Sequence, residues 1–427
     1  MTEPYTLAVD AMGGDHAPAM VIAGLEVASE RHPGARFLLV GDEAKIAPLL
    51  AAHRRAAAAC TLRHAPDVIS NEAKPTTALR QRQASMRVAI DAVAAGEASG
   101  VVSAGNTGAL LALAKIVIKT LPGIDRPAMA AIGPSARGDV VMLDLGANVT
   151  CDTRNLVEFA VMGDVFARTV LGLTAPSIGL LNVGSEELKG DDRVRDAAEI
   201  LRQSAIGKQF YGFVEGHDIA AGTTDVVVTD GFTGNVALKT GEGALKLIGE
   251  LLRQVFRSSI AARLAYLLAR PGLDRLREWL DPRRYNGAVM LGLNGVVVKS
   301  HGGTDAQGFA HAMDVAVDMV VHRFNDHIRR GLAGVAVLNH AAGTQNGANA
   351  PAGNSTKGNA TGGNSTGGNP TLETPTLGTP ALGTPTRENI TGESPPLGNS
   401  TVGSPTGART GTAERESAPL ASAQPSD

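Results

Sequence analysis

The amino-acid sequence predicts an α/β fold in which helices cover both faces of an open sheet. Three observations lead to this prediction: short apolar runs alternate with helical patterns, the segments DVVVTD and GVVVKS each contain three consecutive valines, and polar, glycine-rich loops follow the apolar runs. Continuous β-branched runs are typical of strands buried on both faces, as in parallel sheets. Regular alternation of such runs with helices is typical of α/β architectures.

The elements follow in order along the chain. The apolar runs predict strands at residues 6–12, 37–41, 100–104, 140–145, 177–183, 225–229 and 296–300. Helical periodicity predicts helices at residues 76–95, 109–119, 155–171, 194–204, 235–258 and 305–330. Because open α/β sheets bind ligands at the carboxyl ends of their strands, we expect the functional site in the loops after these strands.

Composition and charge narrow the class of protein. The chain has 427 residues, a formal net charge of -3 and an aromatic share of only 3%. This charge gives no basis for nucleic-acid binding. Cys60 and Cys151 form no CxxC motif, and we expect two reduced thiols. The N-terminus lacks a basic signal-peptide region, and no stretch has the roughly 20 apolar residues of a spanning helix. We therefore expect a cytoplasmic protein.

The composition changes near residue 335. Residues 335–427 are rich in Gly, Asn, Ser, Thr and Pro and contain the repeat TPTLGTPALGTPT. Such a segment cannot bury enough apolar surface to offset the entropy lost on ordering. We therefore expect one α/β domain at residues 1–334 and a low-complexity, disordered C-terminal tail at residues 335–427.

The loop SAGNTGA, between a predicted strand and a predicted helix, is the first candidate anion site. Its glycines let the backbone approach an anion, and the free N–H groups of the helix stabilise negative charge. Its candidate ligand-binding residues are Ser103, Asn106, Thr107 and Gly108. An N-capped turn is the alternative, because Asn and Thr are ordinary cap residues.

Other strand ends carry similar residues: Asn148, Lys189, Asp230, Thr233, Asn235 and Lys299. The sequence has no GxxxxGK[ST], no GxGxxG after its first strand, no HExxH and no GxSxG. P-loop ATPases, standard dinucleotide enzymes and Ser-His-Asp hydrolases therefore have little support. Anion cradles without a clear nucleophile suit a reaction in which a bound phosphate itself attacks an acyl carbonyl.

Taken together and in order, these motifs resemble the phosphate acyltransferase (PlsX) family of bacterial phospholipid synthesis. The segments that carry the resemblance span roughly residues 6–330: AVDAMGGDHAP, SAGNTGA, RPAMA, LDLGAN, GSEELKG, VEGHDI, DGFTGNVALKT and LGLNGVVVKSHG. The resemblance implies a three-layer α/β/α sandwich related to phosphotransacetylases and isopropylmalate dehydrogenases. It also implies transfer of a fatty acyl group from acyl carrier protein to inorganic phosphate, with no metal and no nucleotide cofactor.

The resemblance further implies a homodimer that associates peripherally with the inner face of the cell membrane. There, a membrane-bound glycerol-3-phosphate acyltransferase would use the acyl phosphate product. Segment 258–284 suits such a surface, because leucines at helical spacing are flanked by arginines and include the chain's only Trp, Trp279. We expect an amphipathic helical hairpin here, broken at Pro271 and Gly272. Binding of acidic carrier protein, a dimer interface and ordinary helix packing are the alternatives.

The loop after the first strand combines two acids, two glycines and a histidine. Gly13 and Gly14 are expected to expose backbone N–H groups, while Asp10, Asp15 and His16 position or deprotonate a ligand. The alternative is that both acids cap a helix beginning near residue 17. Asp10 and His16 are therefore catalytic candidates.

Lys189 and Lys299 are the candidates for countering phosphate and oxyanion charge, with exposed surface lysines as the alternative. Asp230, Thr233 and Asn235 are expected to bind phosphate or the pantetheine arm.

The sequence leaves two rival functions open. An isopropylmalate-dehydrogenase-like oxidoreductase would need converging aspartates, for which Asp144, Asp152 and Asp230 are available. A membrane-docking scaffold would need only the hairpin.

Overall fold

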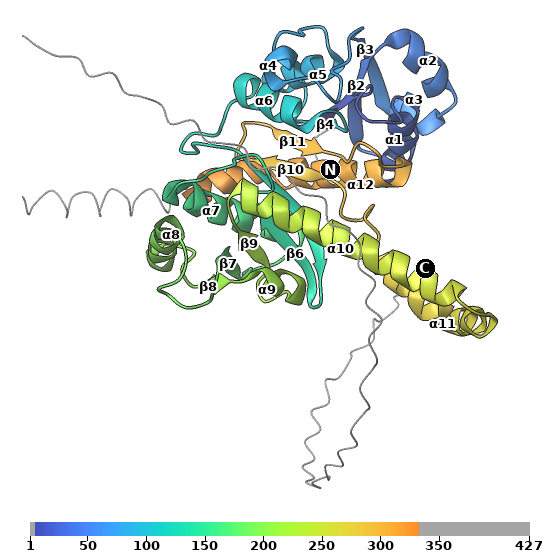
Figure 1. The fold of residues 1–427 in the computed structure, drawn as a ribbon. Coiled ribbons are helices and arrows are strands. Elements are labelled where there is room, and N and C mark those ends of the chain that lie inside the picture. The colour runs from blue at the N-terminus through green and yellow to red at the C-terminus, as the bar shows by residue number, and fades with distance from the viewer. Residues whose placement is uncertain (1–4, 333–427) are drawn as a thin grey trace, which may run out of the picture. The chain divides into compact units, whose positions relative to one another are not determined.

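The computed structural model describes residues 5–332, which build one mixed sheet of 11 strands (Figure 1). The strands are β1 (Tyr5–Asp10), β2 (Ala35–Gly41), β3 (Cys60–His64), β4 (Gly100–Ser103), β5 (Ala128–Ser135), β6 (Gly138–Leu143), β7 (Ile178–Leu181), β8 (Phe210–Val214), β9 (Val226–Val228), β10 (Ala288–Leu291) and β11 (Val296–Lys299). Their order in the sheet is β3-β2-β1-β4-β11-β10-β5-β6-β9-β7-β8. Only β10 with its two neighbours and β5 with β6 pair antiparallel.

The helices of the described residues are α1 (Ala19–Arg31), α2 (Glu43–Ala51), α3 (Arg54–Ala59), α4 (Pro75–Ala78), α5 (Ser85–Ala94), α6 (Thr107–Val117), α7 (Thr153–Val170), α8 (Asp192–Gln203), α9 (Gly216–Ala221), α10 (Gly231–Arg257), α11 (Ile260–Trp279) and α12 (Ala306–Val321). Among them, no helix combines the length and the apolar composition needed to cross a membrane.

Alternate side chains of β1 enter two different cores. Leu7 and Val9 belong to the cluster of buried residues that includes those of α1 and α12, whereas Ala8 belongs to the cluster that includes those of α5 and α6. Figure 1 shows these two helix groups on opposite sides of the β1–β4 part of the sheet. The predicted three-layer α/β/α arrangement is therefore confirmed, and burial on both faces explains the continuous apolar runs.

All seven predicted strands are present, but four further strands were missed: β3, β5, β8 and β10. The helix predicted at 76–95 is wrong as one unit, because it divides into α4 and α5. The helix predicted at 305–330 is interrupted at His322 and Arg323, where Arg323 adopts a φ of 50°. The predicted tail at 335–427 lies outside the described residues.

The hairpin predicted within residues 258–284 is wrong, because this segment holds one helix, α11. A helical hairpin forms instead between α10 and α11, which turn at Ser258 and pack Phe256 against Tyr266 with ring centroids 5.4 Å apart. The break predicted at Pro271 and Gly272 is therefore wrong, since α11 runs through both residues. An interior proline costs about 3 kcal/mol and a glycine about 1 kcal/mol relative to alanine, so the other residues of α11 must offset both costs for the helix to continue.

Candidate active site

The ends of β1 and β4 meet at the buried carboxylate of Asp10. The hydroxyls of Ser85 and Ser103 donate to its two oxygens at 2.6 Å each, and the N–H of Met12 donates at 3.2 Å. Ser103 Oγ also accepts from the N–H of Gly105 at 3.1 Å. Burial raises the pKa of Asp10, although the two serine hydroxyls oppose this effect. Asp10 thus connects its own loop, the SAGNTGA loop and the start of α5.

Lys299 ends β11, directly beside Ser103 in the sheet. Its side chain is 9% exposed, so the alternative of an exposed surface lysine is wrong for this residue. The ammonium donates to the carbonyl of Ala104 at 3.3 Å and to that of Ser300. Burial lowers the pKa of Lys299 to about 8, while the carboxylates of Asp10 and Asp15 act in the opposite direction. The structure therefore places a buried cation at the carboxyl ends of the central strands.

The loop after β1 approaches the β4–α6 loop closely at Gly13. A Cβ at Gly13 would lie 2.5 Å from Asp10 Oδ2 and 2.7 Å from the backbone N of Gly105. Gly14 has a φ of 109°, which only glycine adopts readily. Asp15 and His16 are exposed. The alternative that Asp10 and Asp15 cap a helix is wrong, because α1 begins at Ala19 without a side-chain cap.

Asn106 caps α6, as the capped-turn alternative predicted. Its Oδ1 accepts from the N–H of Ala109 at 3.0 Å, and its Nδ2 donates to the carbonyls of Ser70, Asn71 and Ala73. Both the oxygen and the nitrogen of the Asn106 side chain are therefore already hydrogen-bonded to backbone groups of the protein. Binding of phosphate by Asn106 stays a prediction.

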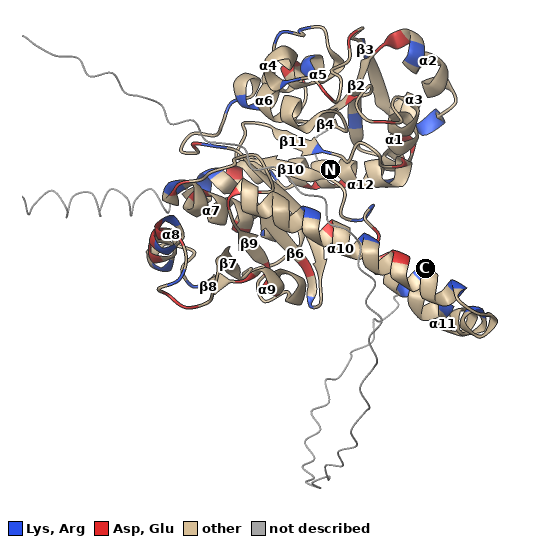
Figure 2. Cartoon of the chain, in the orientation of Figure 1, with Lys and Arg blue, Asp and Glu red and all other residues tan. Residues whose placement is uncertain are grey.

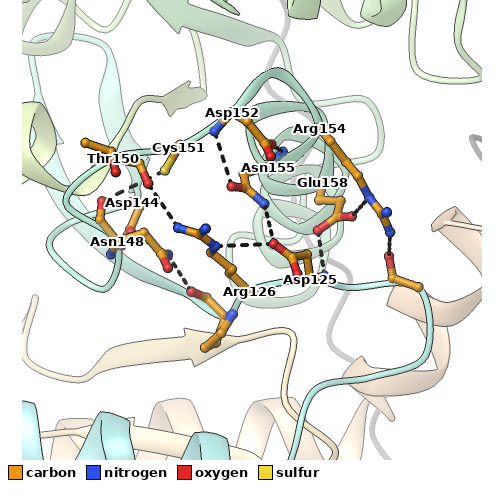
Figure 3. A network of polar contacts seen from close by, with 12 residues as sticks. Asp125, Arg126, Asp144, Asn148, Thr150, Cys151, Asp152, Arg154, Asn155 and Glu158 are labelled. Carbon is orange, nitrogen blue, oxygen red and sulfur yellow. Dashed lines mark hydrogen bonds and ion pairs between the residues drawn. The ribbon is translucent and has the colours of Figure 1, made fainter. Parts of the chain in front are cut away.

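A second polar network fixes the loop after β6 (Figure 3). Asp144 is fully buried and accepts from the N–H groups of Met129, Gly146, Ala147 and Asn148 and from the Asn148 amide, at 2.7 to 3.2 Å. The Asn148 amide also donates to the carbonyl of Pro127 at 2.7 Å. Burial raises the pKa of Asp144, against the effect of these donors. Asn148 thus holds the loop, and its predicted ligand role stays a prediction.

Asp152 and Asp230 cap helices in the same region. Asp152 accepts from the N–H of Asn155 at 2.8 Å at the start of α7, and Asp230 accepts from the N–H of Thr233 at 2.9 Å at the start of α10. Together with Asp144, these are the aspartates that an oxidoreductase would need for a metal. Within residues 5–332, no group of three His, Cys, Asp or Glu side chains is placed to hold a metal ion.

Lys189 lies in the loop after β7, away from Lys299. It is exposed and pairs with Glu186 at 2.7 Å, and this contact raises the pKa of Lys189. The loop itself is held by Asn182, whose amide donates to the carbonyls of Gly184 and Lys189. The catalytic role of Lys189 stays a prediction.

A cavity of about 2420 Å³ joins several of the predicted residues. Its lining includes Thr107 and Gly108 at the start of α6, Asn235 on α10, and Lys299. The remainder is mostly apolar and includes residues that sequence reasoning missed: Met129, Ala131, Met142, Leu238, Leu245 and Ile248. No sequence signal marks this wall, because the alternation of buried and half-buried residues from Ala128 to Ala131 on β5 is seen only in the structure.

Comparison with known proteins decides the family. A family model described as "Fatty acid synthesis protein" matches residues 5–327. The phosphate acyltransferase of Granulibacter bethesdensis is 72% identical over 340 residues, which is 80% of this chain and 92% of that protein. The chain belongs to the PlsX family of phosphate acyltransferases.

Two further comparisons agree with this membership. The phosphate acyltransferase of Gluconacetobacter diazotrophicus is 71% identical over 336 residues, 79% of this chain and 90% of that protein. A phosphotransacetylase from Streptococcus pyogenes, 17% identical, superposes with a TM-score of 0.53 over 75% of this chain and 95% of its own, which shows a shared fold. The oxidoreductase and scaffold alternatives gain no support from these PlsX relatives.

Proposed function

We propose that the chain transfers a fatty acyl group from acyl carrier protein to inorganic phosphate and releases acyl phosphate for phospholipid synthesis. Membership of the PlsX family supports acyl transfer to phosphate. The observation that carries the proposal is a cavity whose lining combines a buried lysine, a helix N-terminus and a mostly apolar surface. Such a cavity suits an anionic headgroup joined to an acyl chain.

The proposed reaction needs no protein nucleophile. Burial raises the pKa of Cys60 to about 12 and that of Cys151 to about 11, so both thiols stay protonated at neutral pH. Instead, a phosphate oxygen attacks the thioester carbonyl carbon and forms a new C–O bond. The tetrahedral intermediate then collapses, the C–S bond breaks, and the pantetheine thiolate leaves and takes a proton from water. Acyl phosphate and free carrier protein are the products.

The protein contributes position and charge. The free N–H groups at the start of α6, at Thr107 and Gly108, hold the phosphate, and the helix dipole stabilises its charge. The ammonium of Lys299 neutralises the phosphate and the oxyanion that forms on the carbonyl. Asp10 keeps Lys299 charged and holds Ser103 in place. Lys189, in the loop after β7, and His16, in the loop after β1, are further candidate donors.

The proposed partners follow from the hairpin. Arginines recur along α11 (Figure 2), beside exposed leucines such as Leu264, Leu267 and Leu268. Basic amphipathic helices bind anionic lipid surfaces. We therefore propose a cytoplasmic homodimer that associates peripherally with the inner face of the membrane, where a glycerol-3-phosphate acyltransferase takes the product.

The test is acyl phosphate formation from acylated carrier protein and inorganic phosphate, without added metal or nucleotide. Lys299→Ala, Lys189→Ala and Asn106→Ala are compared with the unchanged chain. Lys115→Ala is the matched control, because this lysine lies exposed on α6 outside the cavity lining. We expect a loss of at least 100-fold in kcat/KM for Lys299→Ala, as for removal of an oxyanion donor.

The outcomes separate activity from site. If the unchanged chain forms no acyl phosphate, the proposed function is wrong. If product forms and Lys299→Ala, correctly folded, keeps full activity, the function stands and the site is placed wrongly.

A further inference from the structure

Two walls of the cavity supply most of its apolar lining. One wall is β5 with its antiparallel neighbour β6, where Ala131 pairs with Met142. The other wall is α10, which passes beside β6 (Figure 1) and lines the cavity with Leu238, Ala244, Leu245 and Ile248. The charged side chains of Lys239, Glu242 and Lys246 also line it along this stretch. None of the proposed catalytic steps uses these residues.

Both walls begin at the same place. The N–H of Met129 donates to Asp144 at 2.9 Å, and the N–H of Leu145 donates to the carbonyl of Met129 at 2.9 Å. On the other wall, Asn235 lies against Gly146, where a Cβ would come 3.6 Å from the Asn235 Cβ. Met129 and Asn235 therefore flank one loop, and both walls extend from it.

The side chains of both walls are incompletely covered by protein. On β5, Ala128 and Ala130 are fully buried, whereas Met129 and Ala131 face the cavity and are only half-buried. On α10, Leu245 and Ile248 are 43% and 53% exposed. An apolar chain inserted between these walls would remove both surfaces from water, which is the main driving force for apolar binding.

We propose that the acyl chain of the donor and product lies between β5 and α10, and that Ala131 and Ala244 limit its length. This inference rests on the proposed function, because the phosphate headgroup must lie at Lys299 for the acyl chain to lie between β5 and α10. An acyl phosphate matches the cavity in both parts, since the lysine and helix N-terminus face its anion and the apolar walls face its chain.

Ala131 and Ala244 lie at different distances from the start of their walls. Strands rise about 3.3 Å per residue, so Ala131 lies roughly 7 Å beyond Met129. Helices rise about 1.5 Å per residue, so Ala244 lies roughly 14 Å beyond Asn235. Filling either position with a larger side chain should therefore exclude chains of different lengths, with Ala131 acting on shorter chains than Ala244.

The experiment measures kcat/KM for a series of acyl carrier protein thioesters with chains of 8 to 18 carbons. Each buried methylene contributes a factor of about 4 in affinity. Ala131→Phe should lose at least tenfold in kcat/KM for hexadecanoyl relative to octanoyl donor. Ala244→Phe should show its loss only with the longest chains. Ala265→Phe is the matched control, because Ala265 is exposed on α11 outside the cavity lining.

Binding can also be measured without turnover. Trp279 is the chain's only tryptophan and lines the same cavity. A brominated long-chain fatty acid, below its micelle concentration, should quench its fluorescence saturably, and Ala131→Phe should weaken this quenching at least fivefold. Octadecanoate without bromine should compete.

Each result decides one question. The assignment would be overturned if both variants showed the same dependence on acyl-chain length as the unchanged protein, or if the quenching were not saturable. Either result would favour a second copy of the protein as the occupant of the cavity. Failure of the unchanged chain to form octanoyl phosphate would instead reject the proposed function. Because Ala244 is exposed on a helix, its variant should fold even if Ala131→Phe does not.

Discussion

The buried ammonium of Lys299 connects phosphate binding to pH. Its pKa of about 8 results from burial, against the effect of Asp10 and Asp15. A bound phosphate favours the charged amine, so phosphate should bind less well once the free enzyme loses this proton. We expect KM for phosphate to rise up to tenfold per pH unit above about pH 8. The measurement is KM for phosphate from pH 7.5 to 9.5, with Lys299→Met for comparison.

The variant provides the contrast for this pH dependence. In Lys299→Met, KM for phosphate should be high at every pH and should not rise further above pH 8. An equal rise in both proteins would show that another group is responsible, and Lys299 would lose its proposed role.

The same residue has a predictable effect on stability. The folded-state pKa of about 8 lies below the ordinary value of 10.5, so the folded state binds the proton less well than the unfolded state. Burial of the charged amine therefore opposes folding below pH 8, and this penalty disappears as pH rises toward 10.5. Between pH 8 and 10, the unchanged chain should gain about 2 kcal/mol of unfolding free energy relative to Lys299→Met. Urea unfolding at both pH values measures this difference, and an equal change in both proteins would contradict the argument.

Gly13 tests the close approach of the β1 and β4 loops. Gly13→Ala would place a methyl group against Asp10 and the backbone of Gly105, and a clash with backbone cannot be relieved by rotating a side chain. We expect a loss of about 1–3 kcal/mol of unfolding free energy and reduced turnover. Gly34→Ala is the control, because a Cβ there meets nothing within 4 Å. Equal effects of the two substitutions on stability would argue against the close approach.

At the element scale, α7 depends on the capping box formed by Asp152 and Asn155. Asp152→Ala should lower the unfolding free energy by about 1 kcal/mol, because an N–H of the first turn loses its acceptor, while Asp152→Ser should retain most of the stability. Asp192→Ala, in the first turn of α8, should change it by less than about 0.5 kcal/mol. Thermal unfolding of the three variants checks this order. A serine variant as unstable as the alanine variant would exclude the cap as the cause.

The sequence predicts best those elements that have a strong local pattern. The valine runs of β9 and β11 identify those strands, whereas β5 reads as AMAAIGPS and gains its strand conformation from pairing with β10 and β6. The helix predicted at 76–95 divides because Ser85 donates its N–H to the carbonyl of Asp67, a contact between distant residues. Pairing partners far along the chain therefore decide what local propensity leaves open.

The same distinction applies to the site. Lys299 was predicted from its strand-end position, but its burial depends on the neighbouring strands β4 and β10. Residue type alone predicts Asn106 and Asn148 as ligand donors, yet their side-chain amides donate to backbone carbonyls. The apolar wall was not predictable, because β5 and α10 are separated by about 100 residues and come together only in the fold.

At the scale of the whole molecule, the order of the strands makes the last part of the described chain necessary for the sheet to form. The last strands, β10 and β11, lie in the middle of the sheet, where they join β4 on one side to β5 on the other. Lys299 and the cavity therefore form only after the final strands have paired. Helix α12 then packs against α1 and α7 and covers this central part.

The C-terminal boundary can be tested by two truncations. The family match ends at residue 327, but Phe324, Ile328 and Leu332 are at most 9% exposed and belong to the main core. Truncation after residue 322 removes all three, and each buried large apolar side chain contributes about 2 kcal/mol. Because this loss is comparable to the net stability of a domain, we expect insoluble or unfolded protein. Truncation after residue 339 keeps these residues and should leave both the melting temperature and acyl phosphate formation unchanged. Loss of soluble protein in the longer truncation would place the domain boundary beyond residue 339, and a stable shorter truncation would show that these side chains are dispensable.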